Sequence, residues 1–218
     1  MKKIIAVFTF FLAVVSGSFA WTNNLGFGGT GFSTKINAAS DNKNSDFAIA
    51  GGGLNFFYLG FSDGGFTVKT NLNIGVVGAK DSVFGDGQKY GMFRGGSIGF
   101  GYTPIRGEKF TLSATAMFGV DGFTFSDDEK NVTIDNKTYS SLTKETNFAL
   151  FDVGGDVFGS YRLTNHFGLF ADVQIRYVIG GASITEHKDG STSVKKDDSL
   201  GWLGTVKVQP TFGLVFNF

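Results

Sequence analysis

Apolar and polar residues alternate along the last stretch of the chain, Leu200 to Phe218. Every second residue counted back from Phe218 is uncharged, and most are large and apolar, whereas the residues between them are mixed and mostly small or polar. A period of two indicates a β-strand, because successive side chains point to opposite faces. The stretch is longer than the usual strand of about five or six residues in soluble proteins. We therefore predict a membrane β-strand with one face toward lipid and the other toward a wet lumen.

The same alternation recurs along the chain and predicts eight strands in all. They cover 25–36, 47–58, 66–78, 92–102, a fifth strand from Phe110, 148–162, a seventh strand from Phe167, and 200–218. Long polar loops at 37–46, 79–91, 125–147 and 183–199 alternate with short turns. This alternation is typical of a barrel with short periplasmic turns and longer external loops. We predict an all-β fold, an eight-stranded antiparallel up-and-down transmembrane β-barrel.

Charged residues follow the same periodicity. A Lys or Arg that faces lipid at mid-membrane costs about 2–4 kcal/mol, and the predicted outward sets of the third and the last four strands carry no charge. A soluble sandwich would instead turn charges outward and phenylalanines inward. The predicted inward charges are Lys69, Asp121, Asp152, Asp156, Arg162, Asp172, Arg176 and Lys207.

Two segments do not fit the simple period. In the first strand, Leu25 and Phe27 share one parity and Phe32 and Ile36 the other, so we expect a bulge among the intervening glycines. Arg94 has the parity of outward residues in its strand. It either reaches lipid headgroups near the outer rim or is turned inward by a bulge at Gly95 and Gly96.

The inward charges form the candidate site. Pairing Tyr161 with Phe167 would place Asp152 opposite Arg176, as an ion pair, and Asp156 opposite Asp172. Two adjacent carboxylates need a cation, from Lys69 or Lys207 on the far wall, or share a proton. The interior of an eight-stranded barrel is just wide enough for side chains to fill. The network is therefore interpreted as a structural plug, with a narrow ion or solute path as the alternative.

The first residues predict export. Lys2 and Lys3 precede a short apolar run from Ile4 to Val15, followed by small residues up to Ala20. This pattern is typical of a secretory signal peptide, and the run is too short for a spanning helix. We predict a signal peptide over 1–20, cleaved after Ala20, and a barrel domain over 21–218.

Composition removes several functions from consideration. The formal net charge is zero, which argues against nucleic acid as a partner. Cysteine is absent, so thiolate metal sites and disulfides are unavailable, and we expect no cofactor or metal. The two histidines, His166 in a short turn and His187 in a polar loop, lack a convincing nucleophile nearby, so we predict that the chain is not an enzyme.

The aromatic carboxy-terminal strand and the segment YRLTNHFGLFADV at 161–173 resemble the small bacterial outer-membrane β-barrel superfamily, whose eight-stranded class has OmpA-, OmpX- and OmpW-like members. The resemblance implies an outer-membrane location in contact with lipid. It also implies that periplasmic chaperones and the barrel-insertion machinery assist biogenesis, with Phe216 and Phe218 as the insertion signal.

Two functional classes remain for a barrel of this kind. The favoured prediction is a structural or surface-interaction barrel whose four polar loops contact a host or cell-surface ligand, because loops on a rigid scaffold commonly carry binding. The alternative is a narrow porin-like channel for small or apolar solutes, which the OmpW-like resemblance would suggest.

Overall fold

The computed structural model describes residues 21–40, 43–80, 88–190, 192–201 and 205–218, and the predicted signal peptide and Trp202 to Gly204 lie outside them. The described residues form nine β-strands and contain no helix long and apolar enough to cross a membrane. The strands are β1 (Trp21–Ser40), β2 (Lys43–Ser62), β3 (Phe66–Lys80), β4 (Gln88–Arg106), β5 (Phe110–Ile134), β6 (Lys137–Arg162), β7 (Phe167–Asp189), β8 (Thr192–Gly201) and β9 (Thr205–Asn217).

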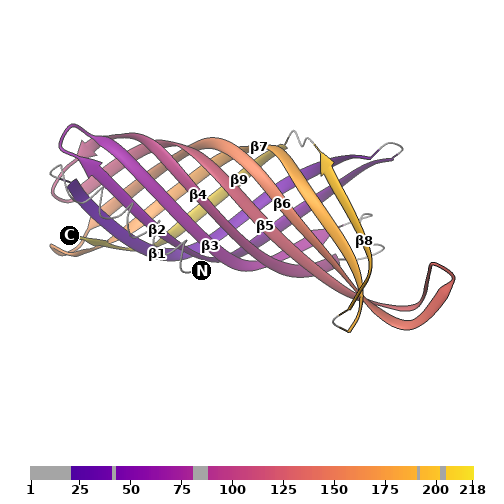
Figure 1. The fold of residues 1–218 in the computed structure, drawn as a ribbon. Coiled ribbons are helices and arrows are strands. Elements are labelled where there is room, and N and C mark those ends of the chain that lie inside the picture. Colours follow the sequence, from indigo (N-terminus) through magenta and orange to yellow (C-terminus); the bar gives the residue numbers. More distant parts are fainter. Residues whose placement is uncertain (1–20, 41–42, 81–87, 191, 202–204) are drawn as a thin grey trace.

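Eight of these strands close into a barrel. Neighbouring strands from β1 to β6 pair antiparallel, β6 pairs with β7, β7 with β9, and β9 with β1. Figure 1 shows the resulting tilted cylinder, and backbone bonds between Asn23 and Phe218 join the two described ends of the chain. The predicted fold class is confirmed. β8 stands outside this ring because it pairs with β7 alone among the described strands.

Three predicted loops, at 37–46, 125–147 and 183–199, are mostly paired strand extensions instead. β1 and β2 pair as far as Ser40 and Lys43. β5 and β6 remain paired as far as Ile134 and Lys137, and Asp135 and Asn136 form their turn with positive φ angles of 49° and 63°. β7 and β8 pair up to Asp189 and Thr192, and β6 and β7 up to Thr143 and Lys188. Strands β5, β6, β7 and β8 form a projecting sheet beyond the rim (Figure 1). The sequence pattern missed it because both faces of this sheet are wet, which removes the apolar alternation.

The two ends of the barrel differ. We call the end with the short turns at 63–65, 107–109 and 163–166 the turn end, and the opposite one the hairpin end. A girdle of aromatic side chains lies on the outer wall at the turn end, and several are half exposed, including Phe66, Tyr102, Phe110, Tyr161 and Phe218. Such aromatic rings are typical of the edges of a membrane-spanning barrel wall.

The facing of the side chains agrees with the period of two, with one correction. β1 pairs with β2 in an unbroken register, so the predicted bulge is wrong. Leu25 and Phe27 are exposed on the outer wall, whereas Phe32 is buried inside the barrel. The apolar residues of β1 change parity because the apolar Phe32 occupies an inward position. The backbone of β1 therefore contains no bulge.

The predicted register between β6 and β7 is also wrong, by two residues. Tyr161 pairs with Leu169, which puts Asp156 opposite Gln174 and Asp152 opposite Val178. The amide of Leu163 donates to the carbonyl oxygen of Phe167 at 2.8 Å, and this turn bond sets the register. A shift of two keeps every side chain on its predicted face.

Candidate functional site: the filled lumen

Seven of the eight predicted inward charges, all except the half-buried Arg162, lie buried inside the barrel. Each side chain is buried, with exposed fractions between 0% and 3%. We call this set the charged belt; its members are Lys69 on β3, Asp121 on β5, Asp152 and Asp156 on β6, Asp172 and Arg176 on β7, and Lys207 on β9. Because the members come from five strands around the ring, their contacts cross the lumen and tie its walls together.

Nearer the hairpin end, the belt centres on Asp152. Arg176 Nη1 donates to Asp152 Oδ1 at 2.9 Å, and Lys207 Nζ lies 2.9 Å from Asp152 Oδ2 and also contacts Asp121. The pair of Asp152 and Arg176 therefore exists despite the wrong register. It is diagonal, since Arg176 lies opposite Gly154 and reaches along the strand.

Nearer the turn end, Lys69 holds two carboxylates together. Its Nζ contacts Asp156 and lies 2.8 Å from Asp172 Oδ1. Thr115 Oγ1 donates to Asp156 Oδ1 at 2.6 Å. Lys69 reaches these carboxylates from β3, on another part of the ring. Lys207, the other predicted cation, instead contacts Asp121 and Asp152.

Buried amides that sequence reasoning did not single out join the two halves. Gln174 donates to Asp172 at 2.9 Å and accepts from Arg176 Nη2 at 2.8 Å. Gln209 accepts from the same Nη2 at 3.0 Å and donates to Asn73 Oδ1 at 3.1 Å. The inward parity of Gln174 and Gln209 in the sequence was the signal that could have identified them. The result is one connected network, in which losing a member leaves other buried groups without partners.

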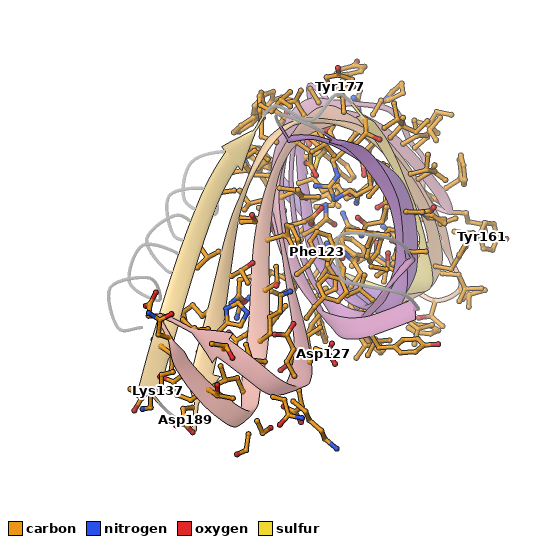
Figure 2. All side chains as sticks on the ribbon, turned by 90° about the vertical axis from the view of Figure 1, so that its right-hand side faces the viewer. Phe123, Asp127, Lys137, Tyr161, Tyr177 and Asp189 are labelled. Carbon is orange, nitrogen blue, oxygen red and sulfur yellow. The ribbon has the colours of Figure 1, made fainter. Side chains whose placement is uncertain are left out.

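An apolar cluster adjoins the belt toward the hairpin end. Phe32, Phe93 and Phe123 stack inside the barrel with ring centroids 4.5, 5.4 and 5.8 Å apart. Ile49, Val77, Leu150 and Val178 belong to the same hairpin-end cluster. Figure 2 views the barrel from this end, with Phe123 at the lumen and Tyr161 and Tyr177 pointing away from the wall.

A second apolar cluster adjoins the belt toward the turn end. Phe57, Phe158 and Phe170 lie with centroids 4.7 to 5.6 Å apart, packed with Leu59, Phe61 and Val215. Along β7 the inward order is Phe170, Asp172, Gln174, Arg176, Val178, so the belt lies between two apolar layers. Inward phenylalanines therefore do not distinguish a soluble sandwich from this barrel, because a narrow barrel must also fill its interior with side chains.

Glycines give the charged belt its space. A Cβ atom on Gly119 would lie 2.1 Å from Arg176 Nη1 and 2.4 Å from Asp152 Oδ1. One on Gly95 would lie 2.2 Å from Asp121 Oδ1. These inward positions on β4 and β5 therefore have to lack a side chain for the ion pairs to form.

Arg94 lies on the outer wall. It is exposed, and its pairing with Ile74 on one side and Gly122 on the other is continuous through Gly95 and Gly96. The bulge that would turn Arg94 inward is therefore absent, and the alternative, an outward guanidinium, holds.

The histidines lie outside the charged belt. His166 Nδ1 is 3.4 Å from the carbonyl oxygen of Asn217 at the turn end. His187 Nε2 is 3.5 Å from Glu129 Oε2 in the projecting sheet. Among the residues that the structure describes, no group of three or more His, Cys, Asp or Glu could hold a metal ion.

Partly exposed ion pairs occupy the projecting sheet. Lys188 Nζ lies 2.9 Å from Glu145 and 3.4 Å from Glu186, and Lys144 lies 3.4 Å from Glu129. The hydrogen bond from Asn147, followed by the bond from Lys188, lowers the pKa of Glu145, and the bond to Glu145 raises the pKa of Lys188. Figure 2 shows Asp127, Lys137 and Asp189 on this sheet, beside the barrel mouth.

The architecture matches known barrels. A major outer membrane protein from Thermus thermophilus has a TM-score of 0.59 and 15% identity, over 90% of this chain and 99% of that one. The chain has the fold of the small outer-membrane β-barrels. No protein-family model matches the sequence, and no curated protein matches it significantly.

Two further solved outer-membrane proteins are more distantly similar to the chain. Escherichia coli outer membrane protease OmpT has a TM-score of 0.48 and 10% identity, over 91% of this chain and 96% of that one. Yersinia pestis Ail, in complex with the heparin analogue sucrose octasulfate, has a TM-score of 0.43 and 13% identity, over 91% and 99%. At such identities the likeness concerns the fold alone.

In this outer-membrane barrel fold, β9 is the strand that closes the ring. Its outward Phe216 is half exposed, and the terminal Phe218 exchanges backbone hydrogen bonds of 3.1 and 3.0 Å with Asn23 of β1. The role of Phe216 and Phe218 as an insertion signal stays a prediction.

Proposed function

We propose that the chain is an outer-membrane barrel that presents its projecting sheet at the cell surface, with a plugged lumen that serves as structure. The apolar outer wall supports this location, because half-exposed residues such as Leu72, Ile74, Phe118, Ile175 and Phe212 would be unfavourable in water. The signal peptide over 1–20 and insertion through the carboxy-terminal strand belong to the same proposal.

The observation that carries the interaction role is the projecting sheet. Its outer strands, β8 and the part of β5 from Asp128 to Ile134, each have a strand partner on one side only among the described residues. Unpaired strand edges can accept an additional strand from a partner. Charged residues on both faces add polar contacts around that edge, so a host or cell-surface protein is the kind of ligand the sheet suits.

The filled lumen supports a structural plug rather than a path for ions or solutes. Lys69, Arg176 and Lys207 are at most 1% exposed, and an apolar layer lies on either side of them. An ion passing through would lose its hydration in these layers, and moving a charge into such surroundings costs several kcal/mol.

Planar-bilayer recording of the refolded chain 21–218 tests the plug. We expect no discrete conductance steps; regular steps would support the channel alternative. A double variant, Phe93→Ala with Phe123→Ala, is the matched comparison, because it thins the hairpin-end cluster without removing a charge.

Deletion of 126–146 tests the surface role. Thr124 and Asn147 are paired neighbours, so an Asn-Gly dipeptide inserted between Phe125 and Asn147 closes the shortened hairpin after the deletion. We expect binding to cells or extracellular matrix to fall, while heat-modifiable mobility on gels shows that the barrel still folds. Undiminished binding after this deletion and a second one of 187–195 would overturn the interaction role.

A further inference from the structure

Among the described residues, one guanidinium faces outward from the apolar wall without a partner. Arg94 is exposed on β4, next to Ile74, 50% exposed, and Met92, 63% exposed. No described carboxylate or carbonyl group forms an ion pair or hydrogen bond with it. A charge in such apolar surroundings is costly unless a partner comes from outside the chain.

The height of Arg94 on the wall suits a headgroup. It lies eight residues along β4 from Tyr102 of the turn-end girdle. With a rise of about 3.3 Å per residue and a tilt of about 40°, that distance is about 20 Å along the barrel axis. The apolar band of such barrels is about 25 Å tall, so Arg94 lies near its hairpin-end edge.

An apolar groove of about 470 Å³ begins on the turn-end side of Arg94. Its outward lining comes from four neighbouring strands and comprises Gly96, Ile98, Phe118, Val120, Phe151, Val153 and Ile179. Gly96 pairs with Val120, and Val120 with Phe151, directly below the level of Arg94. The groove therefore lies on the same strands as Arg94 and its neighbours Gly122 and Ala149, two residues closer to the turn end.

Small residues lie beside Arg94 on the neighbouring strands, next to the groove. Arg94 pairs with Gly122, and Gly122 with Ala149. A Cβ atom on Gly122 would lie 3.4 Å from Arg94 Cγ and 3.5 Å from Nε, so the arginine side chain lies over this glycine. On the other side, Thr124 donates to Asn147 at 2.7 Å and forms a polar rung. The rim side of Arg94 is mixed, because the exposed apolar residues Met92 and Val76 continue this polar rung on β4 and β3. The turn-end side of Arg94 is the apolar groove.

We propose that Arg94 and this groove bind one anionic membrane lipid, with its phosphate on the guanidinium and an acyl chain in the groove. This proposal rests on the membrane location proposed above. Guanidinium matches phosphate oxygens with two parallel hydrogen bonds. A zwitterionic headgroup brings its own cation, so the site favours a net negative lipid.

Native mass spectrometry of the refolded barrel, released from bilayers of equal phosphatidylglycerol and phosphatidylcholine, tests the headgroup. We expect one phosphatidylglycerol to be retained preferentially. Arg94→Gln should lower the ratio of bound phosphatidylglycerol to phosphatidylcholine about fivefold, the effect of one basic group near an anionic membrane surface. Lys130→Gln, which removes an exposed charge from the projecting sheet, is the matched control and should leave the ratio unchanged.

The groove has its own test. Gly96→Leu fills it, and the new Cβ meets Leu72 Cδ2 at an ordinary 3.6 Å. Gly29→Leu is the control, because this outward position on β1 has no atom within 4 Å of the new Cβ. We expect Gly96→Leu, and not Gly29→Leu, to shorten retention of the anionic lipid at unchanged headgroup composition.

Separate results overturn the lipid site and the membrane role. Equal retention of both lipids by the wild type, or an unchanged ratio in Arg94→Gln, would overturn the site in a barrel that still inserts. So would full competition by inorganic phosphate, which would show an anion site without a chain. Failure of the wild-type chain to enter bilayers, read from heat-modifiable mobility, would instead overturn the proposed membrane role.

Discussion

The same three strands, β5, β6 and β7, pass through two surroundings. Within the ring, their side chains divide into an apolar outer set and an inner set of buried ions and rings. In the projecting sheet, the ion pairs of Glu129, Glu145, Lys144, His187 and Lys188 keep side-chain exposures from 14% to 31%, against 0% to 1% in the belt. The strands are continuous across this boundary, so the difference comes from the surroundings, and equivalent ion pairs should contribute unequally to stability.

Arg176→Met is expected to give the largest effect on this comparison. It removes the donor to Asp152 Oδ1, Gln174 and Gln209, which leaves these buried oxygens unpaired, although Lys207 still contacts the other oxygen of Asp152. Breaking a buried pair in this way costs about 3–5 kcal/mol. Urea unfolding in detergent, followed by heat-modifiable mobility, measures the loss. Lys188→Met in the projecting sheet is the control and should leave the barrel transition in place; equal loss in both variants would contradict the comparison.

Gly119→Ala should have an intermediate effect. Its methyl group would meet Arg176 Nη1 and Asp152 Oδ1 at 2.1 and 2.4 Å. Overpacking of this kind costs about 1–3 kcal/mol. The same unfolding measurement applies, with Gly29→Ala on the open outer wall as the matched substitution. If Gly119→Ala left the unfolding stability unchanged, the charged belt would have room to shift.

The pH dependence of the projecting sheet is the smallest expected effect. The depressed pKa of Glu145 means that its contribution is present above the ordinary carboxyl value of 4.5 and is lost as pH falls through the lower folded-state pKa. The raised pKa of Lys188 means that its contribution is present below 10.5 and is lost as pH rises beyond the folded-state value.

Amide hydrogen exchange of residues 143–147 and 184–188, corrected for intrinsic rates, measures this effect. We expect the strongest protection at intermediate pH and weaker protection in strong acid and strong base. Glu145→Gln with Lys188→Gln should flatten the profile. An unchanged profile in that double variant would assign the dependence to other groups.

The sequence predicted which face of the barrel wall each charged side chain occupies. It did not predict how neighbouring strands are paired. The period of two identified the inward charges Lys69, Asp152 and Arg176, because hydrocarbon admits few charges. It could not provide the β6–β7 register, which a turn bond at Leu163 sets two residues away from the expected one. The diagonal reach of Arg176 preserved the pair all the same.

The apolar filling of the lumen escaped prediction for a different reason. Phe57, Phe123 and Phe158 have inward parity in the printed sequence, but a wet lumen was expected, and the buried rings replace much of that water. The projecting sheet was missed because its residues are polar on both faces. Each error arose where the surroundings, rather than the periodicity, determine which side chain is acceptable.

The two apolar layers around the charged belt have a consequence for salt. Dissolved ions screen charges that they can approach, over about 8 Å at physiological ionic strength, and buried pairs are screened much less. The belt is enclosed on both sides, so the barrel should keep its stability from dilute buffer to molar salt. The ion pairs outside the rim should weaken over the same range, so that added salt loosens the sheet while the cylinder beneath it remains closed.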